Sequence, residues 1–103
     1  MELKKAFGKV LNWVRVTRGY TQEDFSIVSS RTYISTLERG LYSPTLEKLD
    51  VIASVIKVHP ITLLIGCYAL RDDLTPDEIF AQVKRELEED QVLEGVSDII
   101  QRP

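Results

Sequence analysis

The chain has little of the residue types that build disulfides, metal sites and redox centres. It holds one cysteine, one histidine and one tryptophan in 103 residues. A lone Cys67 cannot form an internal disulfide, and its neighbours Ile65 and Gly66 favour a buried, unreactive thiol. The single His59 has no Cys or carboxylate cluster at metal-ligand spacing around it, which favours a structural role. We therefore expect no metal ion and no other cofactor.

Signals for catalysis, export and membrane insertion are also missing. No glycine-rich phosphate loop and no nucleophile elbow occurs, so the sequence does not predict an enzyme. No apolar run approaches the roughly 20 residues that span a bilayer. Residues 1–9 lack the apolar core of a signal peptide. These absences predict a cytoplasmic protein without a membrane partner.

The composition is that of an ordinary globular protein, but its charge is uneven. Hydrophobic residues make up 44% of the chain and charged residues 28%, in a length that suits a single modest core. The net charge of -3 divides into nine basic against six acidic side chains in residues 1–60 and four against ten in residues 61–103. Such asymmetry is typical of a nucleic-acid-binding part joined to an element with another task.

Apolar spacing predicts an all-α fold. Helical spacing begins at Leu3 and ends near Gly19, which can stop the first helix. The apolar stripe of that helix is Leu3, Phe7, Val10, Leu11 and Val14. A second helix is expected to start after Thr21, where Asp24 stands at the third position of a capped first turn.

Residues 31–39 are predicted to form a third helix with a polar outer face. Ser30 is a suitable N-cap, and Gly40 can adopt the left-handed conformation beyond the end. At about 100° per residue, Ile34 and Leu37 share one side. The other side carries donors and acceptors suited to base edges and phosphates. These residues are Thr32, Ser35, Thr36, Arg39 and, at the N-terminal tip, Arg31. Periodicity alone favours the simpler interpretation of an ordinary surface helix.

Several short motifs resemble one family in their order and spacing. They are Thr21-Gln22-Glu23-Asp24-Phe25, Arg31-Thr32-Tyr33-Ile34-Ser35, Leu37-Glu38-Arg39-Gly40 and Ser43-Pro44-Thr45-Leu46. This run is similar to the phage-repressor/Cro (XRE) class of helix-turn-helix transcription regulators, in particular to the controller proteins of restriction-modification systems. The resemblance covers roughly residues 3–66. It implies a compact, five-helix, repressor-like DNA-binding domain over residues 1–66.

The resemblance also implies roles for individual residues. Base contacts are expected from Arg31, Thr32, Ser35 and Thr36. Phosphate contacts are expected from Gln22, Tyr33, Arg39, Tyr42 and Ser43, although Tyr42 also fits a partly packed surface aromatic. Arg15 and Glu38 occupy positions that pair across two helices in related repressors. The alternative for Glu38 is a simple surface charge.

One departure from the family lies in the turn between the second and third helices. This turn is about two residues shorter than usual and lacks the customary glycine. Ile27, Val28, Ser29 and Ser30 must therefore close it without a residue that favours positive φ. We expect a shortened second helix and a changed angle between it and the third.

Residues 67–103 lie outside the resemblance and are expected to supply a connector, an amphipathic helix and a tail. Thr75, Pro76 and Glu78 form a strong start for a helix over about residues 76–94, which Gly95 should break. An apolar stripe on this helix and a second stripe on the helix after Thr45 predict a dimer interface. Its candidate residues are Val51, Val55, Ile79, Phe80, Val83 and Leu87. Alternatively, the C-terminal stripe covers the core of its own subunit.

Together these observations predict a transcription regulator that binds a pseudo-palindromic site in double-stranded DNA as a homodimer. The competing hypothesis is a protein-interaction module that keeps the helix-turn-helix scaffold and binds another protein, such as a toxin or a polymerase subunit. A small-molecule ligand is not expected, because about 40 residues leave little material for a cavity of about 300 Å³ or more.

Overall fold

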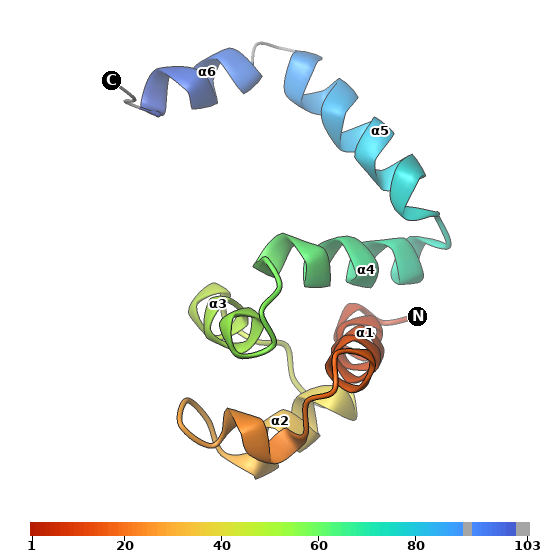
Figure 1. The fold of residues 1–103 in the computed structure, drawn as a ribbon. Helices are drawn as coiled ribbons and strands as arrows, with labels where there is room; N and C mark the ends of the chain where they lie inside the picture. Colours follow the sequence, from red (N-terminus) through yellow and green to blue (C-terminus); the bar gives the residue numbers. More distant parts are fainter. Residues whose placement is uncertain (90–91, 101–103) are drawn as a thin grey trace.

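The structure, a computed structural model, describes residues 1–89 and 92–100 and contains only helices in that part of the chain (Figure 1). The elements are α1 (Leu3–Thr17), the 3-10 turn η1 (Gln22–Phe25), α2 (Arg31–Glu38), α3 (Leu46–Val55), α4 (Pro60–Asp72), α5 (Pro76–Glu88) and α6 (Val92–Ile99). The elements from α1 to α4 pack around one core, and α5 and α6 extend from it as an arm. The prediction of an all-α fold with a further C-terminal amphipathic segment is confirmed.

The core lies where α1, η1, α2, α3 and α4 meet. Its largest fully buried side chains are Phe25, Leu11, Ile34, Leu37, Ile52, Ile56, Leu63 and Cys67. Cys67 is a buried thiol whose pKa is raised by burial, in keeping with its expected role as a small apolar residue. Leu46, whose place at the start of α3 suggests an inward-facing apolar residue, is exposed, because the first residue of α3 lies beyond the edge of the core.

The backbones of α1 and α2 touch. A Cβ atom added to Gly8 would lie 2.4 Å from the carbonyl oxygen of Leu37 and 2.7 Å from that of Glu38. Only a residue without a side chain permits this approach of α1 to the end of α2. Gly40, just past α2, has a φ of 74° and lies against Lys5 of α1. Both glycines therefore fix where α2 sits on its scaffold.

The shortened second helix predicted from the sequence is present as a single 3-10 turn. η1 has four residues, and the N–H of Thr21 donates to Oδ2 of Asp24 at 2.6 Å. The amides of Val28 and Ser29 both donate to the carbonyl of Phe25, at 2.9 and 2.8 Å. None of residues 26–30 has a positive φ, so the turn closes without the glycine that the family usually has there.

The arm begins with two strong local signals. Asp73 ends α4 in the left-handed conformation, with a φ of 55°. Thr75 and Glu78 then cap α5 reciprocally, with backbone-to-side-chain bonds of 3.1 and 3.2 Å. Ile79 is the buried side chain of α5, at its contact with α4. The radius of gyration of 15.4 Å exceeds the roughly 13 Å of a compact domain of this length, because the arm projects.

Two details of the C-terminal expectation are wrong. The helix expected over about residues 76–94 ends at Glu88, and Gly95 lies inside α6 instead of breaking a helix. Glu86, Glu88 and Glu89 place negative charge at the negative end of the α5 dipole, which favours termination there. Residue 66, where the sequence suggests the end of the DNA-binding domain, lies within α4. The part of the tail after Ile100 lies outside the described residues.

Within the described residues no single helix is long and apolar enough to cross a membrane. The bent pair of α3 and α4, at 109° to each other, meets that test only when the two helices are taken together.

Candidate DNA-binding surface

The polar face of α2 is presented to solvent at one end of the molecule, opposite the arm (Figure 1). Ser30 caps the helix by accepting the amide of Tyr33 at 3.0 Å. Ile34 and Leu37 are fully buried, which anchors the inner face in the core. The predicted division of this helix into an apolar and a polar side is therefore present. The outward side of α2 is therefore a short surface of hydrogen-bonding side chains.

The residues expected at bases differ in how freely they can reach DNA. Arg31 and Thr32 are exposed, whereas Ser35 and Thr36 are partly buried. Arg31 Nη1 lies 3.1 Å from Glu23 Oε1, in a pair whose two side chains are about two thirds exposed. Thr36 donates its hydroxyl proton to the carbonyl of Tyr33 at 2.7 Å. It therefore keeps only acceptor capacity and a methyl group for a base.

Glu38 is the centre of a polar network behind the exposed polar face of α2. Its Oε2 accepts from Arg15 Nε at 2.6 Å. Its Oε1 accepts from Arg15 Nη2 at 2.9 Å, Gln22 Nε2 at 3.0 Å and Asn12 Nδ2 at 3.1 Å. Arg15 also donates to the carbonyl of Tyr20 at 2.9 Å. The side chains of Arg15 and Glu38 are only 11% and 6% exposed, so this is a buried pair and not a surface charge.

Burial by itself raises the pKa of Glu38, but the hydrogen bonds from Arg15, Asn12 and Gln22 and the charge of Arg15 outweigh it. The pKa of Glu38 is therefore lowered, and the hydrogen bond to Glu38 raises that of Arg15. Both groups stay charged at neutral pH. The network ties the end of α2 to α1 and to η1 through one carboxylate.

The residues expected at phosphates differ in how exposed they are. Gln22 directs one amide N–H into the Glu38 network, which leaves its second N–H for a phosphate. Arg39, Tyr42 and Ser43 are exposed, the last two in the loop before α3. Tyr33 is partly buried beside the core, and this burial raises the pKa of its hydroxyl. Tyr33 is therefore only partly open to solvent.

Two polar residues near this surface were not found from the sequence. Lys48 of α3 places its Nζ 5.4 Å from the ring centroid of Tyr33, beside α2. Asn12 of α1 is the third side chain that holds Glu38. Neither belongs to a motif, because each is brought to α2 by tertiary packing alone. Lys48 adds a positive charge next to the expected phosphate contacts.

Among residues 1–89 and 92–100, no group of three His, Cys, Asp or Glu side chains could hold a metal ion. His59 caps α4 by accepting the amide of Ile61 on its Nδ1 at 3.0 Å. The chemistry of this face is therefore hydrogen bonding and charge, presented on one helix and its flanking loop.

A short helical element, η1, followed by a turn and by a helix with an exposed polar face, α2, is the arrangement of the helix-turn-helix class of DNA-binding proteins. Comparison with known families agrees, since the helix-turn-helix family matches residues 11–63. The chain belongs to this family, in its phage-repressor (XRE) type, and is a DNA-binding regulator of transcription.

The fold is also similar to a solved structure. The clp gene regulator ClgR from Corynebacterium glutamicum superposes with a TM-score of 0.66 at 23% identity. The match covers 85% of this chain and 93% of that one, so it includes part of the arm as well as the helix-turn-helix. A comparison with curated protein sequences finds no match.

Proposed function

We propose that this chain is a sequence-specific regulator that binds a pseudo-palindromic DNA site as a homodimer, with α2 in the major groove. The observation that carries the proposal is the exposed polar face of α2, held from behind by the buried Arg15–Glu38 pair. A recognition helix must keep its angle while it enters the groove, and a buried bidentate pair supplies that rigidity.

Within this proposal, Arg31 and Thr32 at the exposed N-terminal end of α2 read bases first. Ser35 follows one turn later, and Thr36 accepts a hydrogen bond or contacts a thymine methyl group. The Arg31–Glu23 pair does not prevent this, because an exposed ion pair contributes only about 0–1 kcal/mol. Arg31 can therefore leave Glu23 for a guanine at little cost.

Phosphate contacts then surround the recognition helix. Gln22, together with Tyr42 and Ser43 from the loop before α3, is proposed to bind phosphates of one DNA strand. Arg39 at the C-terminal end of α2 and Tyr33 in its first turn are proposed to bind further phosphates, with Lys48 adding positive charge beside Tyr33. Such contacts set register and orientation without reading sequence. They also make binding dependent on salt concentration.

The homodimer is proposed because one α2 reads too little sequence for a selective site. Small helix-turn-helix domains bind two half-sites about 34–36 Å apart, one turn of DNA. The basic half of one copy carries a modest excess of positive charge, and two copies double the phosphate contacts.

The experiment is selection of binding sites from a random duplex DNA pool at near-physiological salt. Enrichment of an inverted repeat, with half-sites about one helical turn apart, is the expected result. Sequence-blind, salt-sensitive retention of DNA would instead contradict sequence-specific reading by α2.

A second candidate function rests on the arm. The apolar residues Phe80, Val83, Val96 and Ile99 are all exposed, on an acidic part of the chain. This surface fits a protein-interaction module that binds another protein, such as a toxin or a polymerase subunit. Failure of the DNA selection, together with a monomeric free chain, would favour this candidate.

A further inference from the structure

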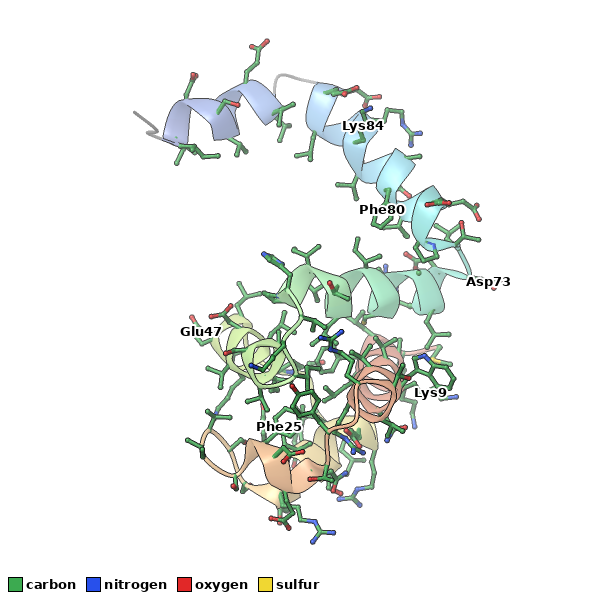
Figure 2. All side chains as sticks on the ribbon, viewed as in Figure 1. Lys9, Phe25, Glu47, Asp73, Phe80 and Lys84 are labelled. Atoms are coloured by element: carbon green, nitrogen blue, oxygen red, sulfur yellow. The ribbon has the colours of Figure 1, made fainter. Side chains whose placement is uncertain are left out.

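An apolar groove runs along the inner side of the arm. It has a volume of about 390 Å³ and is bordered by α4 on one side and α5 on the other, with α6 at its mouth. Its apolar lining consists of Ile61, Ile65, Phe80, Val83, Leu87 and Leu93. Phe80, labelled in Figure 2, lies on the side of α5 that faces α4. Since Ile61 and Phe80 are each 52% exposed, the groove is open to solvent.

The last helix has an apolar face that its own chain leaves largely uncovered, although Leu93 borders the groove. Every described residue of α6 is exposed, and α6 packs only against α5. Its apolar side chains follow the i, i+1, i+4, i+7, i+8 spacing of a single helix face. They are Val92, Leu93, Val96, Ile99 and the following Ile100. An apolar helix face of this kind requires a partner.

We propose that α6 of one copy lies in the α4–α5 groove of a second copy, and that the second copy returns the same contact. This proposal deepens the homodimer of the proposed function and rests on it. An amphipathic helix laid in an apolar groove is a common recognition mode, anchored by residues one turn apart. Because each copy carries both the helix and the groove, a two-fold dimer fills both grooves at once.

Charge at the rim of the groove gives α6 one attractive partner, Lys84, beside one acidic neighbour, Glu88. Both residues border the groove, and Lys84 is labelled in Figure 2. The charged side chains of α6 are Glu94 and Asp98, and the helix has no lysine or arginine. Lys84 of one copy can therefore pair with an acidic residue on α6 of the other. An interface with complementary charge at its rim selects its partner and its orientation.

The extent and position of the contact fit a stable DNA-binding dimer. Each copy contributes ten apolar side chains from its groove and its α6. These would form the centre of an interface whose usual size is about 20–30 residues a side. The arm lies at the end of the molecule opposite α2, so this dimer leaves both recognition helices free for DNA (Figure 1).

The test uses three full-length variants and sedimentation equilibrium. Phe80→Glu places a charge in the groove, and Val96→Glu places one on α6. Both sites are partly exposed, and glutamate is a good helix former, so the helices should persist. Trp13→Glu is the matched control, because Trp13 is 73% exposed and lies on α1, which contacts neither α5 nor α6. Circular dichroism checks that all three stay folded.

We expect the wild-type chain and Trp13→Glu to be dimers. Phe80→Glu and Val96→Glu should each raise the dimer dissociation constant by at least about tenfold, since each removes both reciprocal contacts. An equimolar mixture of these two variants should regain dimer, because the intact α6 of the first fits the intact groove of the second. Neither a misfolded variant nor a different interface would produce this rescue.

A monomeric wild type, dimers that persist in both variants, or a mixture that gains no dimer would each overturn the proposal. The DNA selection is a separate measurement on the wild-type chain, so its result does not depend on the variants. A selected DNA sequence with unaffected dimers in both variants would keep the proposed function and place the interface elsewhere. Absence of any selected sequence would remove the proposed function whatever the oligomeric state.

Discussion

Arg15 of α1 donates two hydrogen bonds to Glu38 at the end of α2, from Nε to Oε2 at 2.6 Å and from Nη2 to Oε1 at 2.9 Å. The same carboxylate holds Asn12 and Gln22, so one side chain links α2 to two preceding elements. The orientation of the proposed recognition helix therefore depends on a residue that faces away from DNA.

Replacing Glu38 by alanine should destabilise the fold by about 3–5 kcal/mol, because it leaves the guanidinium of Arg15 buried without its partner. Urea unfolding measures this free energy. Glu86→Ala, on the exposed side of α5, is the control and should change it by no more than about 0.5 kcal/mol. Equal effects at the two positions would show that the pair adds nothing to stability.

The contribution of Glu38 should depend on pH. Its pKa is lowered in the folded chain, so its stabilising effect is complete above the ordinary glutamate value of about 4.3. That effect is lost as the pH falls through the lower folded-state pKa. The difference in unfolding free energy between wild type and Glu38→Gln should stay constant from neutral pH to about 5 and shrink below about 4.3. A constant difference down to pH 3 would contradict the lowered pKa.

Arg31→Ala should weaken binding to the selected DNA by about 1–3 kcal/mol and relax the preference at one base pair. Affinity is measured for the selected site and for a set of single-base variants of it. Arg85→Ala, which removes a charge from the arm, should leave the base preferences unchanged. If Arg31→Ala weakens every sequence equally, Arg31 contacts a phosphate and not a base.

Glu23→Gln should strengthen DNA binding. The substitution releases Arg31 from its exposed ion pair and removes a negative charge close to the phosphates. We expect a gain of a few-fold, on the order of 1 kcal/mol or less, that shrinks as salt is added. Glu86→Gln removes the same charge from the arm and serves as the control. A gain of the same size in both variants would indicate a general charge effect.

Gly8→Ala should be destabilising by about 1–3 kcal/mol or more, because the new methyl group meets two backbone carbonyls of α2 that cannot move independently. Gly95→Ala is the matched substitution in α6, where a Cβ atom has no neighbour within 4 Å. It should increase helix content, since alanine favours a helix interior by about 0.5–1 kcal/mol over glycine. Thermal unfolding and circular dichroism measure the two effects. Equal tolerance at Gly8 would mean that α1 and α2 do not touch along their backbones.

Local chemistry made most of the helices predictable. The caps at Ser30, Thr45 and Thr75 and the stop at Gly40 place helix ends within a residue or two of where they lie. Cap preferences act over three or four neighbouring residues, so they can be read without knowledge of the fold. The shortened turn before α2 was predictable for the same reason, since its length and missing glycine are local facts.

The end of the arm was less predictable. A continuous stripe from Ile79 onward suggested one helix to about residue 94, whereas α5 ends at Glu88 and α6 begins at Val92. The unfavourable charge in the acidic last turn of α5 and the cost of Gly95 inside α6 are both small free energies of similar size. Pattern alone does not decide between such small terms.

The all-α class, most of the helix caps and the family can be inferred from the amino-acid sequence, because they depend on spacing and on neighbouring residues. Three relationships become visible only in the folded chain: Glu38 accepts hydrogen bonds from three side chains, Lys48 lies beside Tyr33, and the apolar faces of α5 and α6 stay exposed. Those relationships join residues far apart in the chain, and their energies come from burial and distance, which no local pattern contains.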